Sequence, residues 1–273
     1  MEGIIIKNIS NDYVVKIGDN LYNCKPRGKF RKDKLIPLVG DIVEIDTKNN
    51  YILNIKKRKN SLIRPSVANI DKAIIITSVK PKLDTNLLDK LLVITSYNKI
   101  EPIICFSKLD LLNEEELNEI NDIMSYYKKI GYTVIKNTDL EEIKLIFKNS
   151  LSVFVGQSGS GKSTLLNNLD KSLELKTNEI SKSLGRGKHT TRHVELINLY
   201  KGKVLDTPGF SSIDLSKYSK EQIRNSFIEF DKYSCPFKDC FHLNEKECVV
   251  KKQVDNNILR SRYDNYMKFL NDK

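Results

Sequence analysis

The sequence of 273 residues has no apolar run as long as a membrane-spanning helix requires, roughly 18 residues. Cysteine is scarce: the chain has five, and three of them fall between Cys235 and Cys248. This distribution disfavours a secreted, disulfide-bonded scaffold and favours a local metal site in a reducing compartment. The first residues, Met1 to Ile4, lack the basic and apolar pattern of a signal peptide. We therefore expect a cytoplasmic protein that has no contact with membranes.

Internal repeats and low-complexity tracts are also absent, and hydrophobic residues make up 40% of the chain, enough to bury a core. The formal net charge is +11 at pH 7. Residues 1–65 hold 14 Lys or Arg and 7 Asp or Glu, so most of the excess lies there. A basic segment beside nearly neutral ones indicates a polyanionic partner, although a lysine-rich proteome would explain the same composition.

Short strand patterns separated by turns fill residues 1–65, at Gly3–Ile9, Tyr13–Ile17, Leu21–Cys24, Ile42–Ile45 and Tyr51–Ile55. Five short strands in such a segment are typical of an OB-fold barrel. An SH3-like barrel stays possible, because the number of strands does not determine their order. The basic segment Lys25–Lys34 is a candidate contact for RNA phosphates, in which Phe30 would stack or pack, or else a solvated hairpin.

After Pro65 the pattern alternates between strands and helices. Strands are expected at Lys72–Ser78, Ile103–Ser107, Tyr132–Lys136 and Ser152–Val155, and helices at Leu87–Tyr97, Glu114–Lys129 and Leu140–Lys148. This alternation predicts a parallel sheet with helices on both faces.

A glycine-rich loop directly follows the strand pattern that ends at Val155. Its residues are Gly156, Gln157, Ser158, Gly159, Ser160, Gly161, Lys162, Ser163 and Thr164, and a helical pattern follows. This is the GxxxxGK[ST] motif, in which glycines let backbone N–H groups surround phosphate oxygens. Lys162 would reach the β- and γ-phosphates, and the Ser163 hydroxyl would bind Mg²⁺. The motif predicts a nucleoside triphosphate site.

Two further motifs follow the loop at the spacing of a GTPase. A short strand pattern ends in the sequence DTPG, with which Asp206 would hold Mg²⁺ through water and the Gly209 N–H would bond the γ-phosphate. Between this sequence and the loop lies Gly185–His193, a candidate first switch. Thr190 or Thr191 in this switch would close on Mg²⁺.

A GTPase also needs residues that recognise guanine, and no [NT]KxD motif follows Asp206. Before the glycine-rich loop, residues 156–164, which we call the phosphate loop, an apolar strand pattern ends in Ser107, Lys108, Leu109 and Asp110. The aspartate would accept hydrogen bonds from guanine N1–H and N2–H₂, which adenine cannot supply, and the lysine stem would pack along the base. Serine replaces the usual Asn or Thr and has no amide, although it can still hydrogen-bond locally.

The order of these motifs is a circular permutation, with the guanine motif first and the DTPG sequence last. Reopening a domain at a loop is tolerated because domain termini usually lie close together. As a consequence, the second switch leads directly into the segment from Ser216, so a γ-phosphate-dependent movement would pull on that segment.

Four metal ligands gather in the last quarter of the chain, at Cys235, Cys240, His242 and Cys248. Three thiolates and one imidazole form a closed, structural zinc set without an open catalytic position. One zinc ion per chain would stabilise a segment too small to fold by itself. The two remaining cysteines, Cys24 and Cys105, lie in strand patterns and are expected to be buried.

These features predict three domains: an all-β OB-fold RNA-binding domain (1–65), an α/β circularly permuted P-loop GTPase domain (66–215) and a mostly helical Cys₃His zinc-binding domain (216–273). The ordered set, with Pro37–Asp41 in the barrel, resembles the bacterial ribosome small-subunit-dependent GTPase A (RsgA) family over nearly the whole chain. The resemblance implies hydrolysis of GTP to GDP and phosphate, stimulated by the 30S ribosomal subunit. It also implies contact with 16S rRNA and a late role in small-subunit maturation. We expect a monomer, because no long exposed apolar stripe is evident.

The sequence lacks the residue that commonly orients the attacking water in GTPases. Many GTPases place Gln directly after Asp-x-x-Gly to orient the attacking water, and this chain has Phe210 there. Another group must then orient the water, and His189 of the first switch is the candidate, with Arg186, Lys188 and Arg192 as weaker ones. The competing interpretation is that His189 contacts only RNA or solvent.

Three alternatives remain open on the sequence. The protein could be a GTP-controlled RNA-binding module without significant hydrolysis, which Phe210 favours. It could be a P-loop ATPase, which Asp110 disfavours. It could also be a permuted GTPase of the large ribosomal subunit, although such proteins are not expected to combine this barrel with this zinc element.

Overall fold

A computed structural model describes the chain except for residues 10–11, 33–34, 63–65, 171–193, 207–212 and 273. The described residues form two compact units, Met1–Ile74 with Asp139–Ser211, and Ile75–Thr138 with Ser212–Lys273. The predicted domain boundaries at residues 65 and 215 stay a prediction. Among the described residues, every helix is too short or too polar to cross a lipid bilayer.

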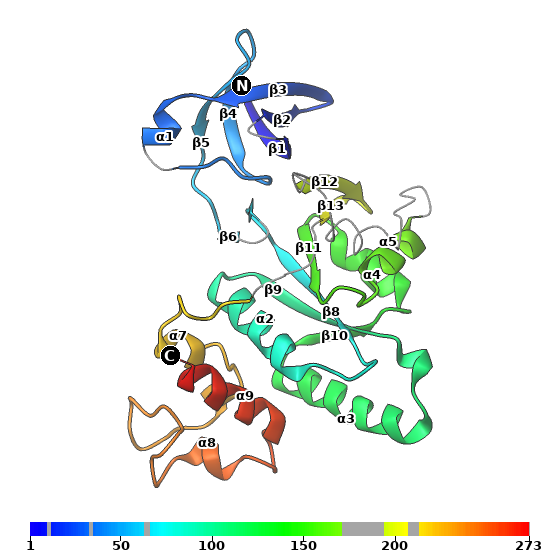
Figure 1. Cartoon of the computed structure of the whole chain (residues 1–273), viewed down its shortest axis with the longest axis vertical. Coiled ribbons are helices and arrows are strands. Elements are labelled where there is room, and N and C mark those ends of the chain that lie inside the picture. The colour runs from blue at the N-terminus through cyan, green and yellow to red at the C-terminus, as the bar shows by residue number, and fades with distance from the viewer. Residues whose placement is uncertain (10–11, 33–34, 63–65, 171–193, 207–212, 273) are drawn as a thin grey trace, which may run out of the picture. The chain divides into compact units, whose positions relative to one another are not determined.

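A closed barrel begins the first unit (Figure 1, blue). Its strands are β1 (Glu2–Ile9), β2 (Asp12–Ile17), β3 (Asn20–Pro26), β4 (Ile42–Asp46) and β5 (Tyr51–Ile55), and the short helix α1 (Lys29–Lys32) lies between β3 and β4. The strand order is β1-β2-β3-β5-β4, and β1 also pairs with β4, which closes the barrel. Only β3 and β5 are parallel. This order is that of an OB fold and decides against the SH3-like alternative.

Alternating apolar residues of the barrel strands form its core. In β2, Tyr13 and Val15 are buried, while the residues between and beside them are more exposed. This period of two is what a strand with one buried face requires. Phe30 of α1 is only 4% exposed, so it packs in the protein instead of stacking outward. Cys24 is buried in β3, as the sequence predicts.

The rest of the first unit is an α/β layer with strands β11 (Leu151–Gly156), β12 (Val194–Leu199) and β13 (Gly202–Asp206) and helices α4 (Leu140–Phe147) and α5 (Lys162–Leu169). β11 and β13 are parallel, and β12 is antiparallel to β13. β12 also pairs with the end of β1, so this layer and the barrel share hydrogen-bonded strands. Two small strands, β6 (Ser61–Leu62) and β7 (Val67–Ala68), pair in the connecting segment.

The second unit contains β9 (Glu101–Ser107), β10 (Thr133–Lys136) and the larger part of β8 (Lys72–Ser78), in the order β10-β9-β8. β9 and β10 pair in parallel. Helices α2 (Thr85–Tyr97) and α3 (Glu114–Ile130) connect these strands. The Asp84 side chain caps α2, and Asn113 with Glu116 forms a capping box at the start of α3. β8 is apolar and buried along nearly its whole length, and Cys105 is buried in β9.

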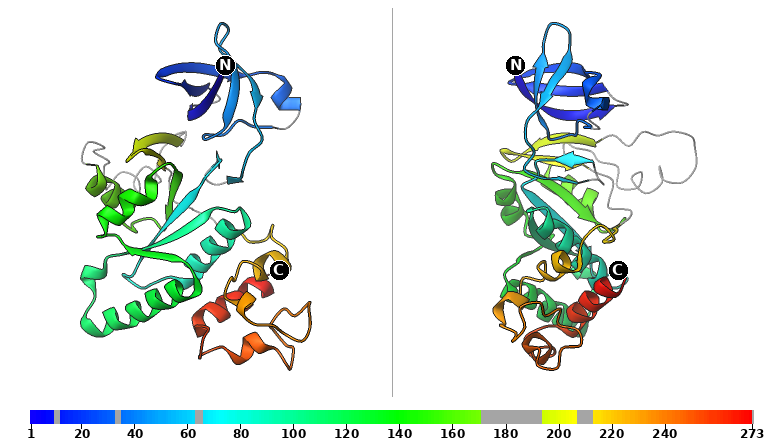
Figure 2. Two further views of the ribbon diagram at one scale, coloured as in Figure 1. Left: turned by 180° about the vertical axis from the view of Figure 1, so that it is seen from behind. Right: turned by 90° about the vertical axis from the view of Figure 1, so that its left-hand side faces the viewer.

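The C-terminal part of the second unit is mostly helical, with α7 (Lys220–Arg224), the 3₁₀ turn η3 (Phe230–Lys232), α8 (Val249–Lys252) and α9 (Arg260–Asn271). In Figure 2 it runs from yellow to red beside the cyan and green helices of the same unit. Its core is aromatic: Phe227, Phe230, Tyr266 and Phe269 are buried against one another.

Candidate nucleotide-binding and metal sites

The glycine-rich loop lies between β11 and α5, in the strand–loop–helix context that its motif requires. β11 is buried along its whole length, so the loop begins on a strand held on both faces. Gly156, Gly159 and Gly161 have φ angles of 146°, 75° and 96°. These values favour glycine, because a Cβ atom is strained there. The glycines of the motif therefore determine the curvature of the loop.

Lys162 is the first residue of α5, and its side chain folds back over the loop. Its Nζ donates hydrogen bonds to the carbonyl oxygens of Gly156 at 2.9 Å and Gln157 at 2.5 Å, and contacts Ser160 Oγ at 3.4 Å. The ammonium group thus lies within the concave side of the loop. Ser163 follows it in the first turn of α5 and is half-buried.

The predicted guanine motif lies where β9 ends. Ser107 is buried, and Lys108 has a left-handed backbone with φ of 63°. This turn leads into the 3₁₀ helix η1 (Leu109–Leu111), on which Asp110 is exposed. The reversal at Lys108 therefore brings the carboxylate out to the surface directly after a buried strand.

Ser107 binds the neighbouring strand. Its Oγ donates to the Thr77 carbonyl oxygen at 3.4 Å, and its own carbonyl oxygen accepts from the Val79 N–H at 3.2 Å. The serine that replaces the usual Asn or Thr thus attaches the motif to the carboxyl end of β8.

Part of the predicted site lies outside the described residues. This applies to His189, Thr190, Thr191 and Gly209. Asp206 is the last residue of β13, and its side chain also lies outside what the structure describes. The roles expected of these residues stay predictions.

The four predicted metal ligands come together in space, with their ligand atoms within 4.8 Å of one another. His242 Nδ1 lies 3.5 Å from Cys235 Sγ, 3.3 Å from Cys240 Sγ and 3.4 Å from Cys248 Sγ, and the Sγ atoms of Cys235 and Cys248 are 3.8 Å apart. Tetrahedral zinc, with bonds of about 2.3 Å to sulfur and about 2.0 Å to nitrogen, separates two sulfurs by about 3.8 Å and sulfur from nitrogen by about 3.5 Å. The donor set and its spacing therefore fit this ion.

Protonation at the cluster also fits a metal site. Burial lowers the pKa of His242, and the charge of Arg224 adds to the effect, so the imidazole is neutral at pH 7 as a ligand must be. Burial raises the pKa of Cys240 to about 12. A buried thiolate at this position therefore requires a cation beside it.

The segment around the metal ligands is held by side chains from outside the cluster. Glu245 accepts hydrogen bonds from the N–H groups of Phe241 at 2.8 Å and Leu243 at 2.7 Å. His242 itself has a left-handed backbone with φ of 60°. Arg224 of α7 donates to the Cys240 carbonyl oxygen at 3.3 Å. We call residues 235–248 the metal loop.

Two family models match this chain. The family model described as RsgA GTPase matches residues 55–216, and the model of the RsgA N-terminal domain matches residues 2–52. The chain belongs to the RsgA family.

Individual proteins match this chain along nearly their whole length. A protein of Oceanobacillus iheyensis named small ribosomal subunit biogenesis GTPase RsgA 2 is 48% identical, over 99% of this chain and 97% of its own. The RsgA of Caldanaerobacter subterraneus is 43% identical, over 100% and 95%. The crystal structure of YjeQ from Thermotoga maritima has a TM-score of 0.85 at 35% identity, over 99% of this chain and 97% of its own. The structure of YloQ, described as a circularly permuted GTPase, has a TM-score of 0.80 at 38% identity, over 99% and 94%.

Family membership confirms several predictions from the sequence. The chain has the fold of the RsgA family, with an OB-type barrel, a circularly permuted GTPase and a C-terminal Cys₃His cluster. It is an enzyme that hydrolyses GTP. The P-loop ATPase alternative is therefore wrong.

Sequence reasoning missed a buried ionic network in this RsgA-family protein. Arg262 of α9 is 1% exposed and binds Asp89 Oδ1 of α2 through Nη1 at 2.6 Å. Its Nε and Nη2 bind the carboxylate of Glu229, and Tyr127 donates to Asp89 Oδ1 at 2.8 Å. An arginine on a helix of mixed composition gives no sequence signal for burial, because its partners lie far away in the chain.

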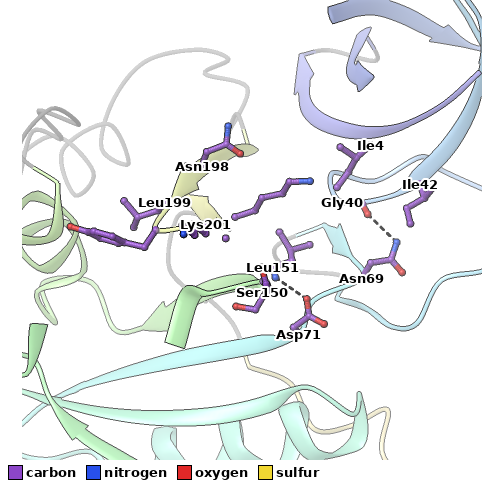
Figure 3. A pocket seen from close by; sticks show the side chains of 14 residues that line it. Ile4, Gly40, Ile42, Asn69, Asp71, Ser150, Leu151, Asn198, Leu199 and Lys201 are labelled. Atoms are coloured by element: carbon purple, nitrogen blue, oxygen red, sulfur yellow. Dashed lines mark hydrogen bonds between the residues drawn. The ribbon is translucent and has the colours of Figure 1, made fainter. Parts of the chain in front are cut away.

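A cavity of about 610 Å³ lies in the first unit, and Figure 3 shows side chains that line it. Ile4 and Gly40 of the barrel, Asp71, and the turn between β12 and β13 line it, together with Leu151. Asp71 Oδ2 accepts from the Leu151 N–H at 2.7 Å. Leu151 begins β11, whereas the phosphate loop follows the end of that strand, so the cavity is distinct from the loop.

Proposed function

We propose that this GTPase binds the small (30S) ribosomal subunit and assists a late step of its maturation, hydrolysing GTP to GDP and phosphate there. The observation that carries the proposal is similarity over the full length to relatives that are named for small ribosomal subunit biogenesis. The basic barrel, in which residues 1–65 carry most of the excess charge, supports contact with 16S rRNA. A ribosomal partner favours action in the cytoplasm, and the monomeric state stays a prediction from the sequence.

The phosphate loop would hold the triphosphate. Backbone N–H groups of Gly156–Thr164 would surround the phosphates, and Lys162 Nζ would exchange its carbonyl acceptors for β- and γ-phosphate oxygens. Ser163 and Asp206 would hold Mg²⁺, which neutralises negative charge on the phosphates when bound. The exposed Asp110 would accept from guanine N1–H and N2–H₂, beside the stem of Lys108.

Hydrolysis requires a group that orients water, because Phe210 cannot do so. We assign this role to His189, in the first switch with Thr190 and Thr191. The free protein would then be slow, and docking on the 30S subunit would order the switch so that His189 reaches the water. Wild-type hydrolysis by His189→Ala on the 30S subunit would refute this role.

Cys235, Cys240, His242 and Cys248 would hold one structural zinc ion. The fit of their spacing to tetrahedral coordination supports this metal. The ion would supply folding energy to the metal loop and no chemistry to the reaction, because all four positions are protein ligands.

The test is the hydrolysis rate of GTP and of ATP by zinc-replete protein, with and without purified 30S subunits. Strong stimulation confined to GTP and to 30S supports the proposal. Equal, slow turnover in every condition would favour a GTP-controlled RNA-binding module. Stimulation by 50S subunits instead would show that the 30S subunit is not the partner.

A further inference from the structure

Helix α9 binds the metal loop through two tyrosines. Tyr263 Oη donates to the carbonyl oxygen of His242 at 2.5 Å, and Tyr266 Oη donates to the carbonyl oxygen of Phe241 at 2.6 Å. The ring of Tyr266 lies 5.0 Å from that of Phe230, which in turn packs edge-on to the His242 imidazole at 5.2 Å. The position of α9 is thus tied to the backbone that carries one metal ligand.

The same helix binds the beginning of α2. Asn265 Nδ2 donates to Asp89 Oδ2 at 2.7 Å and to Thr85 Oγ1 at 3.3 Å, and Asn86 Nδ2 donates to Asn265 Oδ1 at 3.1 Å. Arg262 adds its buried ion pair with Asp89. All of these contacts fall on the first two turns of α2.

The first turn of α2 lies at the edge of the sheet that carries the guanine motif. α2 follows the carboxyl end of β8, and the motif follows the carboxyl end of the adjacent parallel strand β9. Ser107 connects the two ends through its bonds to Thr77 and Val79. Hydrogen bonds therefore run from the metal loop through α9 to the start of α2. From there the chain itself leads through residues 79–84 back to the end of β8, where Ser107 is bound before the turn that presents Asp110.

The ionic part of this connection resists small displacements. Asp89 and Glu229 are almost fully buried and share the single guanidinium of Arg262. A buried carboxylate that loses its partner is costly, so the network favours one arrangement of α9 against α2. A shift of α9 is therefore passed on to α2 instead of being absorbed between them.

We propose that α9 couples metal occupancy to guanine recognition, with Arg262 and Asn265 as positioning residues for the turn that carries Asp110. Zinc in the metal loop then increases the affinity for guanine nucleotides. Because coupling between two binding sites is reciprocal, a bound guanine nucleotide increases the affinity for zinc by the same factor. This inference rests on the proposed roles of Asp110 and of the zinc site.

The test uses Asn265→Ala in the full-length, zinc-loaded protein, because it removes the hydrogen bonds of Asn265 to the start of α2 and leaves the ion pairs of Arg262 intact. The probe is fluorescent N-methylanthraniloyl-GDP, displaced by GDP, by ADP or by inorganic pyrophosphate. We expect GDP to bind about three- to ten-fold more weakly, the usual range for variants along a coupled network. Affinities for pyrophosphate and ADP should not change, because the phosphate loop is untouched.

Asn256→Ala is the matched control. Asn256 is an exposed asparagine of the same C-terminal segment, and its side chain donates a long hydrogen bond to the Lys252 carbonyl oxygen at 3.5 Å. It should bind GDP like the wild type. Arg262→Met is a stronger variant of the same connection; if it fails to fold by circular dichroism, Asn265→Ala decides. Wild-type GDP affinity in folded, zinc-loaded Asn265→Ala would overturn the inference, whereas a wild type that binds GDP and ADP equally would refute the proposed guanine motif itself.

Zinc release supplies a second readout that does not depend on enzyme activity. Transfer of zinc to the coloured chelator 4-(2-pyridylazo)resorcinol is followed with and without saturating GDP. In the wild type, GDP should raise zinc affinity by the factor by which zinc raises GDP affinity. In Asn265→Ala this effect of GDP should be smaller, because only the ion pair of Arg262 with Asp89 still joins α9 to α2. Equal effects of GDP in both proteins would also overturn the inference.

Discussion

The phosphate loop and the metal loop are both short, and they hold their shapes by different means. The phosphate loop takes its shape from its own residues, three glycines with positive φ, and from the buried strand before it. The metal loop depends on distant partners, because Tyr263 and Tyr266 of α9 hold its carbonyl oxygens and its four ligands fit an ion. A local motif of the first kind tolerates changes elsewhere, and a loop of the second kind does not.

Removal of the metal should have the largest effect. With zinc taken up by 1,10-phenanthroline, the metal loop and α9 should lose their packing and stability should fall by several kcal/mol, since structural zinc supplies on the order of 10 kcal/mol of apparent binding energy. Circular dichroism melting with and without chelator measures the change. Added zinc should restore the melting temperature. An unchanged melting temperature after complete zinc removal would show that the metal loop does not depend on its ion.

Arg262→Met should come next. It leaves the buried carboxylates of Asp89 and Glu229 without their counter-ion, so unfolding in urea should show a loss of about 3–5 kcal/mol. The control is Arg260→Met in the same helix. Arg260 pairs with Asp255 on the surface, and its loss should cost less than about 1 kcal/mol. Equal losses of stability in the two variants would show that the buried ion pairs of Arg262 contribute no more than the exposed pair of Arg260.

Lys162→Ala should affect the reaction and not the fold. The lysine contributes its charge to the phosphates while the glycines hold the backbone, so GTP hydrolysis should fall about 100-fold or more with little change in melting temperature. Hydrolysis assays and thermal melts of the same preparation measure both. Lys144→Ala is the control and should retain activity, because this half-buried lysine of α4 pairs with Glu141 and lies outside the phosphate loop. A large drop in melting temperature for Lys162→Ala would mean that the lysine side chain holds the loop.

Gly159→Ala should have the smallest effect of the four. It tests how much the left-handed backbone at Gly159 contributes to stability. A Cβ atom at Gly159 meets nothing within 4 Å, so only the left-handed φ of 75° is strained, at a cost of about 1–2 kcal/mol. Gly28→Ala is matched, since its added Cβ also meets nothing within 4 Å and its φ is not positive. Urea unfolding should show a loss for the first variant only, and equal results would argue against a role of φ at this loop.

Most of the regular structure could be predicted because its signals are local. A few adjacent residues are enough to predict the buried strand at Lys72–Ser78 and the capped helix that begins at Glu114. β12 was missed, because Val194–Leu199 becomes a strand through pairing with β13 and with β1, which lies far away in the sequence. The turn between β12 and β13 uses Tyr200 and Lys201 with positive φ, where a sequence signal would have required Asn or Gly.

The sequence by itself determined which residues are candidates for the sites. The phosphate loop, the predicted guanine motif and the four predicted metal ligands each occupy adjacent or nearby positions, so their spacing alone indicates them. Only the tertiary structure decided that the barrel has OB order, that Ser107 binds β8, and that Arg262 is buried between α2 and the C-terminal segment. Each of these depends on partners distant in the chain. A motif is a local property of the backbone, whereas burial and ion pairing depend on which distant segments pack together.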